Sequence, residues 1–137
     1  MITLTVSSSI QSELIDITRQ VQELVGHQGL QNGVCVLFVP HTTAGLTLNE
    51  NWDPDVKGDI LLTLNEIAPP DRRHRHNEGN SPAHIKASLV GASEMILVQD
   101  GHLQLGSWQG IYLAEFDGPR RRKVYLQFLR DAARSDS

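Results

Sequence analysis

The sequence predicts an α+β domain with a mixed, largely antiparallel, sandwich-like β-sheet and three helices. Short stretches of alternating or β-branched residues occur near both ends of the chain, and three segments with helical signals interrupt them. The 137 residues, of which 39% are hydrophobic, are enough to bury one core. No internal repeat or linker divides them, so we expect one domain over residues 1–130 and a disordered tail over residues 131–137.

The expected strands are short. "ITLTV" (residues 2–6) alternates with a period of two, and "LIDIT" (residues 14–18) is a second candidate. The run 34–39 predicts a buried strand that ends at Pro40, because proline cannot donate to a strand ladder. "GLTLN" follows as a neighbouring strand, and Asp100 with Gly101 forms a hairpin-turn signal. The later expected strands are "EMILVQ", "HLQL", "GIYLAEF" and, after a "DGPR" turn, "KVYLQFL".

Each expected helix follows a capping residue. Thr18, Asp53 and Ser81 are placed to cap a helix, and a proline follows the last two at the first helical position. Between the second and third helices, the polar and basic stretch up to Asn80 predicts a long loop, and such loops are usually functional or mobile. The three helices are expected to end near Gly26, Pro69 and Gly91.

Composition excludes several classes of protein. A net charge of -4 gives no reason to expect nucleic-acid binding, and the longest apolar run is far too short to span a membrane. The lone Cys35 cannot form an internal disulfide, and the N-terminus lacks a secretory pattern, so we expect a cytoplasmic protein. With so many strands and so few helices, one sheet face should stay incompletely covered, and oligomerisation is a plausible cover.

The segment "HTTAGLTLNENWDPD" (residues 41–55) concentrates groups capable of chemistry. His41 follows a buried strand and can bind a metal or transfer protons, or it can simply form a hydrogen bond with a neighbouring threonine. Glu50, Asp53 and Asp55 can hold a hard cation such as Mg²⁺. The alternative is that Asp53 caps the helix and Asp55 interacts with its dipole.

Three further groups have functional and structural interpretations. His74, His76 and His84 match no standard zinc spacing, so the fold would have to bring them together. Trp108 and Gln109 can grip a heteroaromatic ligand, although a core tryptophan at a corner is the alternative. The arginines of "FDGPRRRK" suit phosphate oxygens, but a basic hairpin tip is usually just solvated. These residues fit metal-assisted phosphoryl or diphosphate chemistry, and equally a module that binds a metal or an anion.

Three separated stretches, "HTTAGLTLNENWDPDV", "RHNEGNSPAHIKASLVG" and "DGHLQLGSWQGIYLAEFDGPRRR", strongly resemble, in that order, the YjbQ-like family, also called secondary thiamine-phosphate synthases. The resemblance extends over residues 2–129 and implies a compact α+β domain that assembles as a homotrimer. It also implies a weak thiamine-phosphate synthase activity, a transferase reaction. That reaction joins hydroxymethylpyrimidine diphosphate to thiazole phosphate and releases pyrophosphate.

The resemblance aligns His76 rather than His74 with the family's loop histidine. For such a reaction we expect a divalent metal, Mg²⁺ for the diphosphate or Zn²⁺ at the histidines. A metal-dependent hydrolase of a small phosphorylated metabolite and a non-catalytic metal- or anion-binding protein are the alternatives. The expected metal ligands are His41, Glu50, Asp53, Asp55, His76 and His84. The expected catalytic residues are His41, Glu50, His84 and Gln109. The expected substrate-binding residues are Thr42, Thr43, Lys86, Trp108, Arg120 and Arg122.

Overall fold

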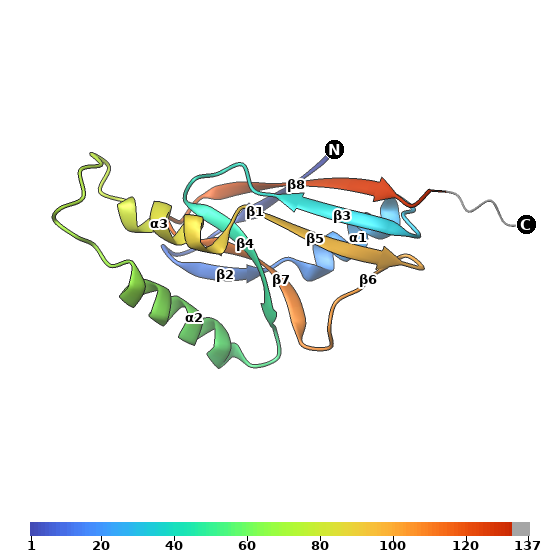
Figure 1. Cartoon of the computed structure of the whole chain (residues 1–137), viewed down its shortest axis with the longest axis horizontal. Coiled ribbons are helices and arrows are strands. Elements are labelled where there is room, and N and C mark those ends of the chain that lie inside the picture. Colours follow the sequence, from blue (N-terminus) through green and yellow to red (C-terminus); the bar gives the residue numbers. More distant parts are fainter. Residues whose placement is uncertain (133–137) are drawn as a thin grey trace, which may run out of the picture.

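Two antiparallel sheets and three helices make up residues 1–132, which the computed structural model describes (Figure 1). The strands of the five-stranded sheet, in spatial order, are β1 (Ile2–Ser7), β8 (Arg121–Arg130), β3 (Gly33–Phe38), β5 (Ser93–Gln99) and β6 (His102–Leu103). Those of the three-stranded sheet are β2 (Glu13–Asp16), β7 (Gln109–Glu115) and β4 (Ala44–Glu50). The helices are α1 (Thr18–His27), α2 (Pro54–Ile67) and α3 (Ser81–Val90).

β7 is the middle strand of the three-stranded sheet and is buried on both faces. Ile111 and Leu113 belong to the core between the two sheets, whereas Tyr112 and Ala114 pack in a second cluster with residues of α2 and α3. Successive side chains of a strand point to opposite faces, so this alternation requires a cover on each side. The domain therefore has three layers: the five-stranded sheet, the three-stranded sheet, and the layer of α2 and α3. This α+β architecture with antiparallel sheets confirms the predicted fold class.

The capping predictions have mixed outcomes. The Asp53 carboxylate accepts a hydrogen bond from the Asp55 N–H (2.9 Å) and caps α2, as predicted. Thr18 does not cap α1: its hydroxyl donates to Asp16 and accepts from the Ile111 N–H (2.8 Å), which ties the helix to β7. Ser81 is the first residue of α3 rather than its cap. A Ser or Thr hydroxyl near a helix start can form hydrogen bonds with several different groups, so the sequence alone did not identify its actual partner.

The C-terminal strands follow the predicted order with shifted ends. Asp100 and Gly101 both have positive φ, 51° and 79°, as a two-residue hairpin turn requires. β8 begins at Arg121, two residues before the predicted start, because Arg121 pairs with Ser7 of β1. Residues 133–137 of the predicted tail lie outside the described residues. No helix within residues 1–132 has the length and apolar character needed to cross a membrane.

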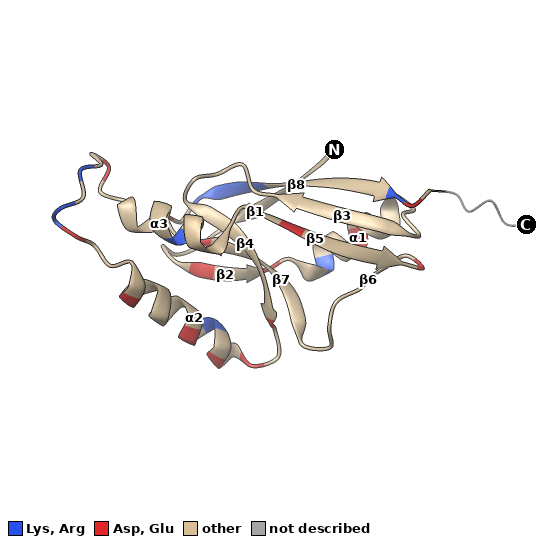
Figure 2. Cartoon of the chain, viewed as in Figure 1, with Lys and Arg blue, Asp and Glu red and all other residues tan. Residues whose placement is uncertain are grey.

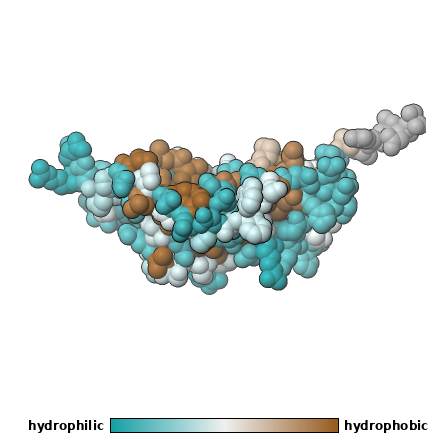
Figure 3. All heavy atoms as spheres, turned by 90° about the horizontal axis from the view of Figure 1, so that it is seen from below, coloured by the Kyte–Doolittle hydropathy of each residue, from teal (hydrophilic) through white to brown (hydrophobic). Residues whose placement is uncertain are grey.

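The loop between α2 and α3 projects from the body of the domain and carries several charged residues (Figures 1 and 2). Elsewhere apolar surface is exposed. Phe38, Met95, Leu97 and Leu129 are exposed on the outer face of the five-stranded sheet, where Leu97 and Leu129 lie opposite the same residue of β3. This confirms the expectation of a sheet face that helices leave uncovered. Hydrophobic side chains also gather at the surface in the half of the molecule nearer the projecting loop (Figure 3).

A close backbone contact joins β4 to the end of α3, and it generates a prediction. A Cβ atom on Gly45 would lie 2.4 Å from the Gly91 carbonyl oxygen, so Gly45→Ala should lower the free energy of unfolding by about 1–3 kcal/mol. Gly58 on α2 has nothing within 4 Å of such an atom, so Gly58→Ala should raise stability by about 0.5–1 kcal/mol. Urea unfolding of both variants measures the difference. Equal effects of the two substitutions would contradict this close contact.

Candidate functional site

A buried ion pair lies where β7 ends and β8 begins. Glu115 is 0% exposed and Arg122 is 4% exposed. The Arg122 guanidinium donates from Nε to one Glu115 carboxylate oxygen (2.9 Å) and from Nη2 to the other (2.5 Å). The same Nη2 donates to the Thr43 hydroxyl (2.8 Å), and the Ser8 hydroxyl donates to Glu115 (2.6 Å). Four segments of the chain therefore share one buried network, which we call the Glu115 network.

The Glu115 network contains two of the predicted substrate ligands, Thr43 and Arg122. Burial alone would raise the pKa of Glu115, but hydrogen bonds from Arg122, Ser8 and the Asp117 N–H hold it below its usual value. Arg122 is buried and bound to Glu115 and Thr43, so it is unavailable to phosphate oxygens in this structure. Thr43 is buried with it, whereas the neighbouring Thr42 is exposed. The predicted binding of phosphate by Arg122 therefore gains no support from this arrangement and stays a prediction.

His41 lies beside the Glu115 network and has a backbone partner. Its Nε2 accepts a hydrogen bond from the Lys123 N–H (2.9 Å), so the neutral ring carries its proton on Nδ1. Burial lowers the pKa of His41, and the positive charge of Arg122 lowers it further. His41 therefore forms a hydrogen bond through Nε2, as the non-catalytic interpretation expected, but its partner is the backbone N–H of a strand residue rather than a threonine. Only Nδ1 is left to meet a ligand.

Arg120 is held at the surface next to the same corner. Its guanidinium donates to the Asp117 carboxylate (2.9 Å) and to the Asp117 carbonyl (2.8 Å). The Asn80 side chain also donates to Asp117 (2.9 Å), and the Asn80 Oδ1 atom is buried with no partner. Burial raises the pKa of Asp117, but its bonds to Asn80 and Arg120 outweigh this and lower it. The corner therefore connects the turn after β7 to the start of α3.

A cavity of about 340 Å³ lies between this corner and the two helices, and we call it the α3 pocket. Lys86 lines it, is only 6% exposed, and donates a hydrogen bond to the Asn65 side-chain oxygen. Burial lowers the pKa of Lys86. Within residues 1–132 its ammonium group forms no ion pair with a carboxylate. The other residues that line the α3 pocket are Gln11, Pro70, Glu78, Gly79, Asn80, Pro82, Ala83, Phe116 and Asp117.

Two of the predicted histidines meet beside the α3 pocket. The rings of His76 and His84 pack edge to face, with centroids 5.2 Å apart. His74 and His76 both line a neighbouring hollow of about 300 Å³, which shares Pro70, Gly79 and Pro82 with the α3 pocket. The structure therefore places the rings of His76 and His84 in contact, and the choice of His76 over His74 as the functional loop histidine stays a prediction.

Four further predicted residues lie at the opposite end of β4: Glu50, Asp53, Asp55 and Trp108. Together with Trp52, which was not predicted, they make up what we call the tryptophan end. Trp52 and Trp108 are 71% and 59% exposed, and their rings lie edge to face with centroids 5.6 Å apart. The interpretation of Trp108 as a core residue is therefore wrong. The Gln109 side-chain oxygen accepts from the Gly106 N–H (2.8 Å) and holds the turn before β7, so its predicted catalytic role gains no support.

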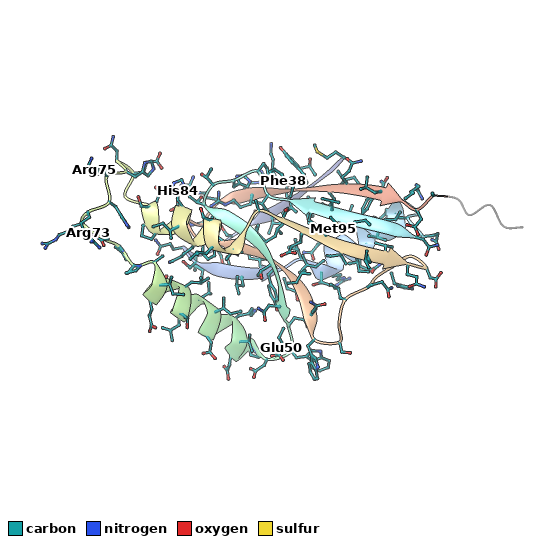
Figure 4. The ribbon with its side chains drawn as sticks, viewed as in Figure 1. Phe38, Glu50, Arg73, Arg75, His84 and Met95 are labelled. Carbon is teal, nitrogen blue, oxygen red and sulfur yellow. The ribbon has the colours of Figure 1, made fainter. Side chains whose placement is uncertain are left out.

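One chain does not gather these groups into a single site. Glu50 lies at the lower edge of the molecule in Figure 4, whereas His84 lies on α3, near the projecting loop. β4 has seven residues, so its two ends are roughly 20 Å apart, and the strand separates Glu50 from Thr43 and His41. The predicted residues instead form three groups: the Glu115 network with His41, the α3 pocket with His76 and His84, and the tryptophan end.

The expected metal ligands are also divided among these three groups. In the part of the chain that the structure describes, no three side chains of His, Cys, Asp or Glu lie close enough to hold a metal ion. Nε2 of His41 is bound to a strand N–H, and Asp53 caps α2. The six residues expected to bind Mg²⁺ or Zn²⁺ therefore do not fit a metal site within one chain, because they belong to different groups.

Several residues of these groups were not predicted. Glu115 stands in the apolar strand "GIYLAEF", and a lone acid in a buried strand was the available signal. Trp52 lies within the quoted motif but has no apolar neighbours that would place it in the core. Asn65 and Asn80 gave no signal, because amides at helix ends and in loops are common. Their roles depend on which residue the fold places opposite them.

Comparison with known proteins gives consistent matches. The family model described as "UPF0047 protein YjbQ-like" matches residues 2–131. UPF0047 protein MJ1081 of Methanocaldococcus jannaschii is 48% identical, and the match covers 92% of this chain and 91% of the relative. UPF0047 protein YugU of Bacillus subtilis is also 48% identical, and the match covers 93% of this chain and 97% of the relative. A crystal structure from Clostridium acetobutylicum has 50% sequence identity and a TM-score of 0.91, and the match covers 94% of this chain and 100% of that one. A crystal structure from Sulfolobus solfataricus has 39% identity and a TM-score of 0.89, and the match covers 94% of this chain and 95% of that one. The second is described as a protein of unknown function.

The Glu115 network generates the first prediction at this site. Glu115→Gln leaves the Arg122 guanidinium buried without a counter-charge and should cost about 3–5 kcal/mol of unfolding free energy, measured in urea. Glu23→Gln is the matched control, because it breaks an exposed ion pair with Arg19 and should cost less than about 1 kcal/mol. Similar losses in the two variants would contradict a central role for the buried pair.

His41 generates a prediction of pH dependence. Its folded-state pKa lies below the usual 6.5, so between these two values the unfolded chain binds more protons than the folded one. The contribution of His41 to stability is therefore full above about pH 6.5 and is lost as the pH falls towards the folded-state pKa. In His41→Gln, the loss of urea stability between about pH 7.5 and about pH 5.5 should be smaller than in the original protein. An identical loss in both proteins would show that His41 does not titrate as its contacts require.

Proposed function

Because this chain belongs to the UPF0047 YjbQ-like family, we propose that it is a transferase-type enzyme that acts on a small phosphorylated metabolite in the cytoplasm. The proposed reaction is a weak thiamine-phosphate synthase reaction, which joins hydroxymethylpyrimidine diphosphate to thiazole phosphate and releases pyrophosphate. This choice of reaction rests on the resemblance of the sequence motifs to secondary thiamine-phosphate synthases. The choice of a phosphorylated ligand rests on the α3 pocket.

The observation that supports an anionic ligand is the position of Lys86. Its ammonium group is buried, lines a cavity and has no carboxylate partner within the described residues. A buried charge without a counter-charge is costly, so an anion that enters the pocket is stabilised there. The N-terminal turn of α3 lines the same cavity, and its dipole also favours negative charge. A volume of about 340 Å³ suits a small ligand.

The chemistry of the proposed reaction needs such a cation. When the bond between the pyrimidine methylene carbon and the diphosphate oxygen breaks, negative charge develops on the leaving group. The nitrogen of the thiazole then forms the new bond to that carbon. A fixed ammonium group stabilises the departing charge without having to reorganise, and the loss of one such contact often costs several kcal/mol. Lys86 has this role in the proposal, and His84 on the same helix is the proposed proton carrier.

Two carboxylates near the pocket do not cancel the charge of Lys86. The Asp117 carboxylate is already bonded to Arg120 and Asn80, and Glu78 is exposed to solvent. Because the expected metal ligands do not meet within one chain, no step of the proposed reaction is assigned to a metal held by this protein. Binding of the ligand therefore depends on Lys86, the amides of the pocket and the turn of α3.

The proposed assembly is a homotrimer. The exposed apolar face of the five-stranded sheet and the exposed Leu62 and Ile67 on α2 support self-association, because large apolar surfaces of this kind usually mark contacts with another chain. No residue of α2 is buried in one chain, although its apolar residues partly pack on the second core cluster. A neighbouring chain would complete their burial.

Substitution of Lys86 tests this proposal. Lys86→Met should weaken the binding of inorganic pyrophosphate at least about tenfold, because a hydrogen bond to a charged group contributes about 1.5–3 kcal/mol. Isothermal titration calorimetry measures this binding, and thiamine phosphate formation from both substrates should fall by a similar factor. Lys123→Met is the control, because the Lys123 side chain is exposed on β8, away from the pocket. Unchanged pyrophosphate binding by a folded Lys86→Met protein would remove the support for an anion site.

The rival functions give different results in the same assays. Steady release of phosphate from a phosphate ester, with water as the acceptor, would favour a hydrolase. Tight pyrophosphate binding that depends on Lys86, with no turnover across a panel of phosphorylated metabolites, would favour a binding protein. Formation of thiamine phosphate above the rate without protein favours the proposed synthase.

A further inference from the structure

Lys86 occupies a position of α3 where a lysine is costly. Ala83, Lys86 and Ala87 are the buried residues of this helix, and their spacing places them on one face. A lysine on such a face usually extends its ammonium group into solvent, but Lys86 is only 6% exposed. Lysine is almost never buried without a carboxylate partner, because the desolvated charge costs free energy. An apolar residue would fill this position more favourably, so the buried amine indicates a chemical role.

The surroundings of Lys86 favour a reactive amine. Its Nζ atom donates to the neutral side-chain oxygen of Asn65, and it forms no ion pair in the part of the chain that the structure describes. Glu78 and Asp117 are the other charged residues that line the α3 pocket; Glu78 is exposed to solvent, and Asp117 is bonded to Arg120. Burial lowers the pKa of Lys86. At neutral pH a larger fraction of it than of an exposed lysine is therefore the free amine, which is the nucleophilic form.

The α3 pocket also places a region that favours phosphate close to this amine. Pro82 and Ala83, in the first turn of α3, line the same cavity as Lys86. Pro82 lies four residues before Lys86, which is about 6 Å along the helix axis. Side chains of a helix lean towards its N-terminus, and the helix dipole favours negative charge there. A small molecule with a phosphate and a carbonyl group, joined by a short carbon chain, can therefore reach both parts of the pocket.

We propose that Lys86 forms a Schiff base with a small phosphorylated aldehyde or ketone that enters the α3 pocket. The free amine attacks the carbonyl carbon and forms a carbinolamine. A C=N bond then replaces the C–O bond, and both hydrogens of the amine leave with the carbonyl oxygen as water. No oxidant, reductant or further reactant is needed. This activity lies outside the proposed synthase reaction, in which Lys86 acts as an ammonium ion, although it uses the phosphate affinity proposed for the same pocket.

Reductive trapping tests the proposal on the full chain. Glyceraldehyde 3-phosphate is the probe, and sodium cyanoborohydride reduces the Schiff base to a stable secondary amine. The chain has three lysines, Lys57, Lys86 and Lys123, so peptide mass spectrometry assigns the adduct to one of them or to the N-terminus. Lys57 and Lys123 are internal controls, because neither lines the α3 pocket. Lys86 should carry at least about ten times as much adduct as either control, because the pocket holds the aldehyde next to its amine.

The contribution of the phosphate is measured with a matched probe. Glyceraldehyde has the same aldehyde but no phosphate, so the pocket should not concentrate it beside Lys86. Its adduct at Lys86 should be at least about tenfold smaller than that of glyceraldehyde 3-phosphate, whereas the two probes should label Lys123 to a similar extent.

Two variants separate covalent chemistry from charge. Lys86→Arg keeps a cation in the pocket but cannot form a Schiff base, so it should still bind pyrophosphate in isothermal titration calorimetry and form no adduct at this position. Asn65→Asp replaces the neutral partner of Lys86 with a carboxylate of nearly the same shape. A nearby opposite charge raises the pKa of a lysine, so the adduct at Lys86 should fall severalfold at neutral pH. Asn77→Asp adds the same charge on the projecting loop, outside the pocket lining, and should leave the adduct unchanged.

Equal labelling of the three lysines by glyceraldehyde 3-phosphate would overturn the proposal, and so would equal labelling of Lys86 by the two probes. Pyrophosphate binding that depends on Lys86, without a selective adduct, would leave the anion site of the proposed function standing and reject the Schiff base. A selective adduct in a protein that forms no thiamine phosphate would support the Schiff base and reject the synthase reaction.

Discussion

The buried ion pair between Glu115 and Arg122 is the constraint on which the rest of the candidate site depends. It joins the end of β7 to the start of β8 and, through Thr43 and Ser8, holds the start of β4 and the end of β1 at the same point. Two charges that are fully removed from water are tolerated only when nearly every polar atom has a partner. Here the carboxylate accepts four hydrogen bonds, so both of its oxygens have partners although the side chain is buried.

The cations near this corner differ in whether a carboxylate partner neutralises their charge. Arg120 and Arg122 are bonded to carboxylates, and Nε2 of His41 is occupied by a strand N–H. Lys86, one layer away, has only a neutral amide as its partner. The two arginines expected to bind phosphate thus already have carboxylate partners within the chain, whereas the lysine in the pocket has none within the described residues. This difference directs the proposed chemistry to the helical layer.

The sequence predicted much of the fold because local signals were strong there. Asp53 with Pro54 and the Asp100–Gly101 turn satisfy backbone requirements within a few residues, and both predictions are confirmed. Thr18 failed as a cap because its best partner, the Ile111 N–H, is 93 residues away in the chain. The site was predicted less well for the same reason. Its residues were correctly placed at ends of strands and in the loop, but which ends lie together depends on sheet order.

The sequence by itself determined the fold class and the family to which the chain belongs, because these depend on short-range patterns and on motifs in order. Only the tertiary structure decided that Trp108 is exposed, that Glu115 is buried against Arg122, and that the motif residues of one chain divide among three places. Burial and pairing are set by residues far apart in the chain. The type of a side chain limits the interactions it can form, but the residue that the fold places beside it decides which interaction forms.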